Sequence, residues 1–556
     1  MIKKIFISCF TLLLVINAAA QVGTFNNSNS YPQEKIYLHT NSNFFLTGES
    51  LVFKIYCLDE DSNLISSLSK VGYVELTDKE NRSIYKQKID LQKGIGTSSI
   101  FLSSTLKTAT YKLISYTQWM RNKQTFFEEN IFIVNPFSNK LTSTDSLKLT
   151  NYNTSFTKNS RLLNLSSDKK IYQKREKVVL NFNTNISENV SISVRKFDSI
   201  EIPDKINSLK FIANFKHSNT SSKKAYLPEL RGSLFKGAIA SNTNTDLFNK
   251  KIGLSFIGEN KITKISLTDS LGVFYFNINK PFDANEVIIE LLEEDNKNYT
   301  ISLITDNDLE KKFDNFDELL LTENIRKIIK QRSLYTQIEN GYNEVKLPTL
   351  KPVLKNEYVF QENENKVIYN LDEYERFKTI KEVAVEILQD VWIRKKKDNY
   401  TFNLRDVNLE SNTELETLLI VDGFIVYNHS DFIYFDALKI KSIEIVKEKY
   451  HFGAKIYQGI INIETFKNQF KPSFPNKNKF TLLKESTPKS YFNPDYSIAE
   501  AKRIPDFRTQ LYWNSDLNND TISFYTSDIS GTFEAIIEGF TKEGTVIYEK
   551  IVFTVK

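Results

Sequence analysis

The residues capable of catalysis or metal binding stand apart from one another in this sequence. No Gly-x-Ser-x-Gly segment supplies an activated serine. None of the four histidines belongs to an H-x₃-H or H-E-x-x-H pattern, the spacings that place two imidazoles on one zinc ion; they are His39, His217, His429 and His451. The sequence therefore predicts no catalytic residue, no cofactor-binding residue and no metal ligand.

Two further kinds of charged group have simple structural interpretations. Glu128 and Glu129 are adjacent in an apolar strand pattern, and neighbours on a strand point to opposite faces, so they are poorly placed to act as an acid/base pair. The basic run at 394–397 precedes a strand pattern. Such a run is typical of a solvated turn, or of a contact with anionic lipid or with an acidic patch of a partner.

Length and composition limit the classes of protein that remain. The chain has 556 residues, and at about 150 residues per domain this length predicts three to four domains. Aromatic residues make up 13% of the sequence, enough for several hydrophobic cores. The formal net charge of +5 is too small for a length of 556 residues to indicate nucleic-acid binding.

The first residues are typical of a secretory signal. Lys3 and Lys4 precede an apolar stretch at 5–16, and three alanines stand before Gln21. We therefore expect residues 1–20 to be removed on export, leaving the mature chain in the periplasm, at the outer membrane or on the cell surface. Gln21 stands where a lipoprotein would have cysteine, so no lipid anchor is expected. No later stretch is apolar enough for a transmembrane helix.

The pattern of short apolar runs predicts a mainly β protein: tandem β-sandwiches plus one α+β domain. A weak repeat relates 34–56 to 162–182, since both contain Lys-Ile-Tyr, a turn, Glu and an apolar strand. The expected segments are sandwiches at 21–137, 161–230 and 231–313, linkers at 138–160 and 467–507, a helix and connector at 314–371, the α+β domain at 372–466 and a C-terminal β unit at 508–556.

The most specific motif lies in the α+β domain. A helix pattern is followed by Val421-Asp422-Gly423, a short helical segment, and a strand hairpin that contains Gly453 and Gly459. This order resembles the plug domain of TonB-dependent outer-membrane receptors. The resemblance implies a structural or interaction role for these five residues. A receptor would continue into a large barrel, whereas only residues 467–556 follow here.

Other segments resemble further families. Lys35-Ile36-Tyr37, Gly48-Glu49 and Phe53 resemble a macroglobulin domain, with Thr47 in place of the family's proline, and 168–176 is a looser copy. Cys57 lies in an apolar strand pattern without the family's thioester motif, so we expect a buried structural thiol. The segment at 268–272, in which 269–272 is expected to form a hairpin turn, resembles a carboxypeptidase regulatory-like domain.

Taken together, the chain resembles secreted multidomain proteins of Bacteroidota. This resemblance implies a non-enzymatic cell-envelope scaffold or adaptor that binds an outer-membrane β-barrel protein, or its assembly or transport machinery, through 372–466 and the connector at 346–370. One alternative is a glycan- or peptide-binding accessory protein of nutrient uptake. Its aromatic platform would be Trp119 or Trp513, although we expect both to be core residues. Another is a degenerate macroglobulin that binds proteases.

Overall fold

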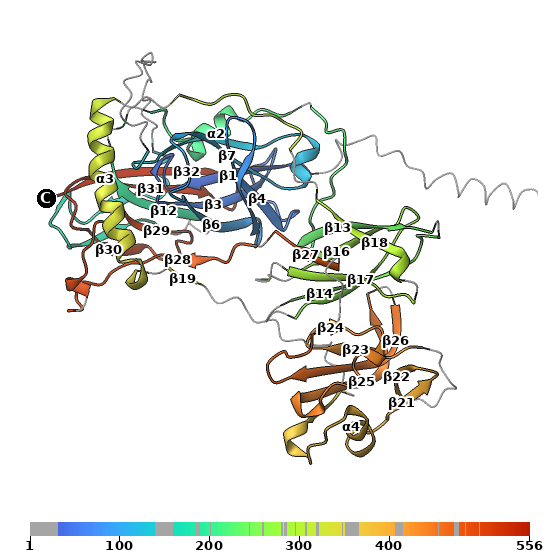
Figure 1. Cartoon of the computed structure of the whole chain (residues 1–556). Coiled ribbons are helices and arrows are strands. Elements are labelled where there is room, and N and C mark those ends of the chain that lie inside the picture. Colours follow the sequence, from blue (N-terminus) through green and yellow to red (C-terminus); the bar gives the residue numbers. More distant parts are fainter. Residues whose placement is uncertain are drawn as a thin grey trace, which may run out of the picture.

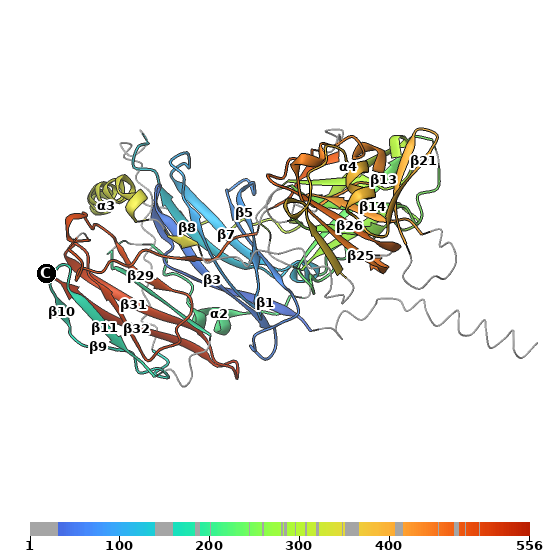
Figure 2. The same ribbon diagram turned by 90° about the horizontal axis from the view of Figure 1, so that it is seen from below.

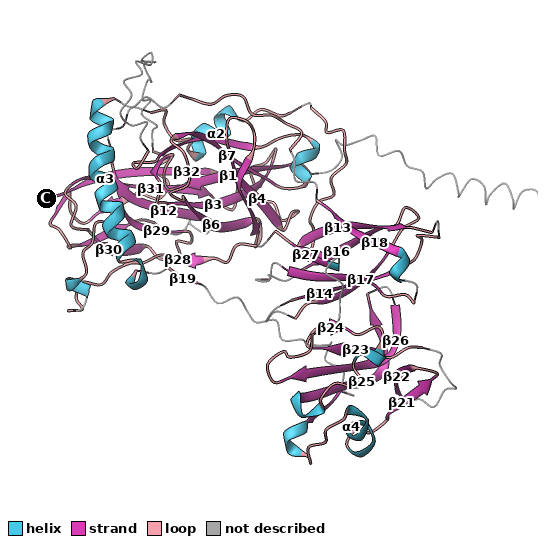
Figure 3. Cartoon of the chain, viewed as in Figure 1, coloured by secondary structure: helices cyan, strands magenta, loops and turns pink. Residues whose placement is uncertain are grey.

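The computed structural model describes most of the chain between residues 32 and 556. The described residues are 32–138, 159–183, 189–198, 200, 202–218, 220–243, 245–257, 261–279, 282, 286–294, 296–305, 309–318, 322–346, 348–350, 366–405, 415–453, 455–471, 478–483, 485–499 and 501–556. The expected signal peptide, most of the linker at 138–160 and much of the connector at 346–370 lie outside them. The described part is mainly β, as the sequence predicts, with helices at its periphery (Figure 3).

The first sandwich occupies residues 32–138 (Figure 1). A three-stranded sheet, in the order β1-β3-β6, packs on a five-stranded sheet, in the order β2-β8-β7-β4-β5. The strands are β1 Glu34–Thr40, β2 Phe44–Leu46, β3 Ser50–Asp59, β4 Val71–Thr77, β5 Ser83–Asp90, β6 Ile95–Phe101, β7 Ala109–Tyr116 and β8 Phe127–Val134.

The second sandwich combines two segments that the sequence analysis separated. Strand β12 pairs on one side with β29 and on the other with β31, so 161–198 and 508–556 form one domain rather than two. The two sheets have the orders β30-β11-β9 and β10-β32-β31-β12-β29. The strands are β9 Ser166–Ser167, β10 Ile171–Tyr172, β11 Lys177–Asn181, β12 Val190–Lys196, β29 Gln510–Asn514, β30 Thr521–Tyr525, β31 Gly531–Phe540 and β32 Val546–Val555.

The first two sandwiches have the same strand order, which confirms that the weak repeat is structural. The register of the repeat, however, differs from the prediction. Lys35-Ile36-Tyr37 lies in β1 beside β3, whereas Ile171-Tyr172 forms β10 beside β32. The counterpart of β10 is β2, because both strands run parallel to the last strand of their sandwich and both precede a turn that ends in glutamate.

The third sandwich also receives a strand from the returning chain. Its sheets have the orders β16-β13-β18 and β15-β14-β17-β27. The strands are β13 Ser233–Ser241, β14 Lys251–Phe256, β15 Thr263–Leu267, β16 Val273–Ile278, β17 Glu286–Leu291, β18 Tyr299–Ile304 and β27 Lys479–Thr481. The turn at 269–272 forms, but the expected hairpin is wrong, since β15 and β16 belong to opposite sheets. The expected linker at 467–507 contains β27.

The distal unit, residues 366–471, is the α+β domain. Its main sheet has the order β20-β25-β26-β23-β24, and β21 and β22 form a separate hairpin. The elements are β20 Lys366–Asn370, α4 Ile380–Glu386, β21 Val391–Lys396, β22 Asn399–Leu404, β23 Leu418–Val421, β24 Phe424–Ile425, β25 Ile440–Phe452 and β26 Lys455–Thr465. The helix is shorter than its sequence pattern. Its N-cap is Thr379, which forms a capping box with Glu382, and the chain turns at Asp390 into β21.

The domains are nested. The chain passes through the first sandwich, half of the second and most of the third into the distal unit, and then returns through β27 to the second sandwich. The third sandwich and the distal unit form an arm that projects from the paired first and second sandwiches (Figures 1 and 2). The other α-helices are α2 Ser208–Asn214 and the longer α3 Glu323–Gly341, and β19 Thr349–Leu350 pairs with β28 Lys489–Ser490.

Candidate binding surfaces

The predicted Val-Asp-Gly motif forms a tight turn with a structural role. Asp422 and Gly423 both have positive φ, 50° and 86°, and connect β23 to β24. The Asp422 carboxylate accepts hydrogen bonds from Thr465 N at 2.8 Å, from Thr465 Oγ1 at 2.6 Å and from Phe470 N at 3.1 Å. Val421 is fully buried in the parallel pairing of β23 with β26. Asp422 thus fixes the end of β26.

Two of the three motif glycines face the third sandwich. Thr263 Oγ1 donates to the Gly423 carbonyl at 2.6 Å. A Cβ at Gly453, which has φ of 62°, would lie 2.2 Å from the Ile265 carbonyl oxygen. Gly459 instead lies at a bulge inside the distal unit, where a Cβ would meet the Val446 carbonyl at 2.2 Å. Gly423 and Gly453 therefore permit a close contact within the chain.

A shared apolar cluster completes this contact. It joins two residues of the third sandwich to six of the distal unit: Ile265, Leu292, Leu418, Ile420, Ile425, Val446, Tyr457 and Ile460. Ionisable groups lie nearby: burial and the neighbouring Asp431 raise the pKa of Glu290 to about 8. Burial lowers the pKa of His429 to about 4, and its Nδ1 accepts from Phe402 N at 2.9 Å. The motif face is thus covered by the third sandwich.

The exposed part of the distal unit includes the hairpin β21–β22, which carries the basic run. The alternation of its strands places Trp392, Arg394 and Lys396 on one face, and Ile393 with Tyr400 on the other, which packs on the core. Trp392 is 47% exposed, an unusual fraction for so large an apolar side chain. The sequence analysis noted the basic run but missed Trp392, because alternation alone does not tell which face of a hairpin is covered.

A second feature is the clamp that α3 forms between the first two sandwiches. Ile325 and Ile329 pack on β2 and β8, and Tyr335 stacks on Phe507 of the second sandwich at 5.3 Å between ring centroids. Between these contacts lies Arg332, which is buried. Its guanidinium binds both oxygens of Glu49 at 2.7 Å and Asp198 at 2.7 Å.

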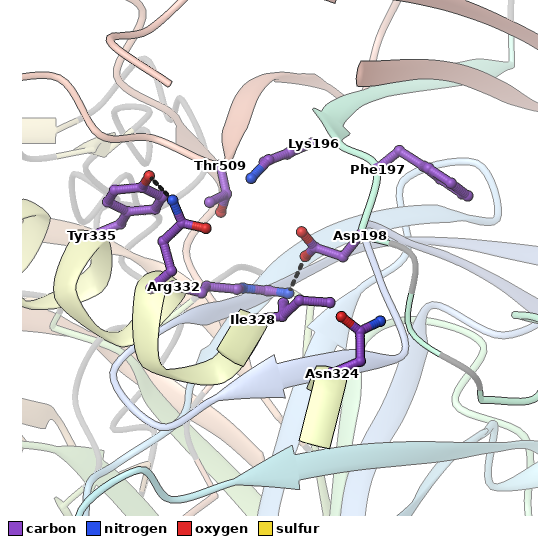
Figure 4. A pocket seen from close by; sticks show the side chains of 9 residues that line it. Lys196, Phe197, Asp198, Asn324, Ile328, Arg332, Tyr335 and Thr509 are labelled. Carbon is purple, nitrogen blue, oxygen red and sulfur yellow. Dashed lines mark hydrogen bonds and ion pairs between the residues drawn. The ribbon is translucent and has the colours of Figure 1, made fainter. Parts of the chain in front are cut away.

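The surroundings of Arg332 form a small hollow of about 200 Å³. Figure 4 shows Arg332 directed from α3 toward Asp198, with Thr509, Lys196 and Phe197 around them. Although burial opposes ionisation, Glu49 and Asp198 raise the pKa of Arg332, so it stays charged. Because two carboxylates already compensate this cation, the arrangement is a structural clamp.

Buried charges also lie where the first and second sandwiches meet. Glu538 is fully buried and accepts from Lys205 Nζ and Ser208 N, both at 2.8 Å, and from Tyr37 Oη. Burial lowers the pKa of His39 to about 3, and its Nδ1 lies 2.6 Å from Ser191 Oγ. Since these groups are sealed from solvent, they join the sandwiches and offer no access to a substrate.

The side chains considered for metal binding, acid/base catalysis or thiol chemistry also have structural roles, as far as the structure describes them. Within this part of the chain, no cluster of three or more His, Cys, Asp or Glu side chains is placed to hold a metal ion. Glu128 and Glu129 point to opposite faces of β8 as predicted. Cys57 is buried in β3, and burial together with Glu34 raises its pKa, which disfavours the reactive thiolate.

Comparisons with other proteins give structural neighbours alone. No protein-family model and no curated protein matches the sequence. Escherichia coli alpha-2-macroglobulin activated by porcine elastase matches 94% of this chain and 44% of its own, at a TM-score of 0.24 and 6% identity. Salmonella alpha-2-macroglobulin reacted with methylamine matches 96% of this chain and 24% of its own, at a TM-score of 0.16 and 8% identity. Dimeric latent PorU from Porphyromonas gingivalis matches 50% of this chain and 33% of its own, at a TM-score of 0.16 and 7% identity.

The chain therefore spans less than half the length of these neighbours. Among the described helices, none has both the length and the apolar character needed to cross a bilayer.

Proposed function

We propose that this protein is a non-enzymatic scaffold or adaptor of the cell envelope, which binds an outer-membrane β-barrel protein or its assembly or transport machinery. Two observations support the proposal. The distal unit resembles a receptor plug in its sequence, and the nested connections hold it at the end of an arm attached through both of its ends.

The observation that carries the proposal is the division of the distal unit into two faces. Its Val-Asp-Gly side packs on the third sandwich, so a partner meets other surfaces, of which the hairpin β21–β22 combines an exposed tryptophan with cations. Aromatic residues and arginine are enriched at protein interfaces, and a basic rim directs the approach of an acidic partner.

Buried side chains give no support to a protease-trapping role. Macroglobulins trap proteases with a Cys–Gln thioester, whereas Cys57 lies in a core strand, fully buried and without that sequence motif. Protease incubation without a covalent adduct would test this directly.

The experiment is a mild-detergent affinity purification of the tagged full chain from its own cells, with quantitative mass spectrometry. We expect an outer-membrane barrel or its assembly subunits at stoichiometric level. The triple variant Trp392→Ser, Arg394→Glu, Lys396→Glu should lose them. Ile368→Ser is the control, because Ile368 is 53% exposed on the edge strand β20 of the same unit. A clean monomer, or equal recovery with the triple variant, would contradict the proposal.

A further inference from the structure

A second and larger cleft, of about 620 Å³, opens beside α3 where the first and second sandwiches diverge. The turn before β3, strands β6 and β29, the end of α3 and the returning chain at 489–492 all line it. Its volume is within the range of small-ligand sites, about 300–1,000 Å³.

Positive charge exceeds negative charge around this cleft. Five cations line it: Arg195, Arg332, Lys346, Lys489 and Arg508. Three of these cations form close ion pairs, with four acids in total. Glu49 and Asp198 bind Arg332, Asp506 binds Arg508, and Glu339 binds Lys346. Lys489 has no ion pair among the residues that the structure describes.

Among the four cleft cations that have a carboxylate partner, Arg195 has the weakest compensation. Its side chain is only 12% exposed, and the nearest carboxylate, Asp198, lies 3.9 Å away and is held more closely by Arg332 at 2.7 Å. Arg195 Nη1 donates to the Asn41 carbonyl at 3.1 Å. Burial and the adjacent Arg332 lower the pKa of Arg195. A buried guanidinium in this position is stabilised by a further anion.

The rest of the lining is rich in aromatic rings. Tyr491, Phe492, Tyr512 and Trp513 line the cleft, together with Phe101, which is 62% exposed. Trp513 is 7% exposed, and its Nε1–H has no acceptor within the described part of the chain. A buried donor of this kind is destabilising unless an acceptor reaches it.

Rings and an undercompensated guanidinium together indicate the class of ligand. The C–H face of a sugar packs on an aromatic ring, its hydroxyls both donate and accept hydrogen bonds, and a carboxylate forms a bidentate pair with arginine. An acidic peptide would also bring carboxylates, but it would not by itself use the aromatic rings that line the cleft.

We propose that this cleft binds a carboxylate-bearing oligosaccharide, with Arg195 and Lys489 facing the carboxylates and the rings of Phe101 and Tyr491 packing on the sugars. This site belongs to the paired first and second sandwiches. It does not depend on the scaffold role of the distal unit, and either proposal can fail alone.

Calorimetric titration of the full mature chain with trigalacturonate, maltotriose and triglutamate tests the proposal. We expect trigalacturonate to bind at least tenfold more tightly than maltotriose and triglutamate, and its affinity to fall with added salt. Phe101→Ser and Lys489→Gln should each weaken binding several-fold, and Arg195→Gln at least tenfold.

Phe137→Ser is the matched control, since Phe137 is 63% exposed but does not line the cleft, and it should leave binding unchanged. Thermal unfolding checks that each variant is folded; if Arg195→Gln is not, the two surface variants decide. Equal binding of trigalacturonate and maltotriose, or no binding at millimolar concentration, would overturn the proposal. Preferential binding of triglutamate would overturn it in favour of a peptide site.

Discussion

The first and second sandwiches have the same eight-strand order, yet they differ at one connection. In the first sandwich, β4 and β5 are joined by a short turn at 78–82; in the second, the equivalent strands β12 and β29 are joined by residues 197–509. Both strand pairs have a register shift next to this connection, at Leu76/Thr77 and at Val194/Arg195.

The difference shows how such a fold accepts a large insertion. Because β12 and β29 pair directly, the two ends of the insertion are held as neighbouring strands, and the entropy of closing a longer loop grows only slowly with its length. The third sandwich holds its insertion differently: the chain leaves it at β18, in one sheet, and returns through β27, which pairs with β17 in the other sheet.

The largest expected effect comes from separating the two halves of the second sandwich. Deleting 508–556 removes four of its eight strands, so the remaining half should lose its fold. Replacing 197–509 by residues 78–82 should instead leave the sandwich folded, with a β12–β29 hairpin. The protection of the Lys177–Asn181 amides against hydrogen exchange measures both outcomes: it should be lost in the deletion variant and kept in the replacement variant. Unchanged protection after the deletion would show that the halves are independent.

The turn glutamates give the next effect. Glu49 and its counterpart Glu176 both accept a main-chain N–H three residues earlier, but Glu49 pairs with buried Arg332, whereas Glu176 pairs with Lys169, whose side chain is 54% exposed. Glu49→Gln should destabilise the protein by about 3–5 kcal/mol, because the buried Arg332 loses its main partner.

Glu176→Gln should cause a much smaller loss of stability, since solvent screens the exposed ion pair of Glu176 with Lys169. Urea unfolding of the two variants compares them, with Lys330→Met on the exposed side of α3 as the control. Equal losses would mean that burial does not distinguish the two turns.

The sequence indicated the mainly β class, the repeated sandwich pattern and the Val-Asp-Gly turn, because these depend on local alternation and turn residues. It did not indicate that β12 pairs with β29, because alternation of apolar and polar residues predicts a strand but not the strand with which it pairs. Arg332 was missed for a related reason: the helical pattern located the apolar side of α3, but the two carboxylates that bind Arg332 come from other domains. The cleft beside it depends on the same long-range packing.

The pH dependence of stability tests the joint between the two sandwiches. Burial raises the pKa of Glu129 to about 7, and it accepts from Ile206 N at 2.8 Å. Between its unfolded pKa and pH 7 the folded state binds more protons, so this carboxyl makes stability fall as the pH rises. Glu129→Gln should therefore flatten the decrease in melting temperature between pH 5 and pH 8. An unchanged slope would show that Glu129 does not titrate in this interval.

The smallest expected effect concerns the residue before each turn glutamate. Gly48 has φ of 89°, and its counterpart Arg175 has φ of 57°. Such positive φ values are unfavourable for residues that carry a Cβ atom. Arg175 is held there by Asp528, with Nε–Oδ1 at 2.6 Å and Nη2–Oδ2 at 2.7 Å. Arg175→Ala and Arg175→Gly both remove this ion pair and differ only in Cβ. We expect the glycine variant to be more stable by about 1 kcal/mol in urea unfolding. Equal stabilities would mean that the second sandwich relaxes the turn once the ion pair is lost, and that only the first sandwich requires glycine.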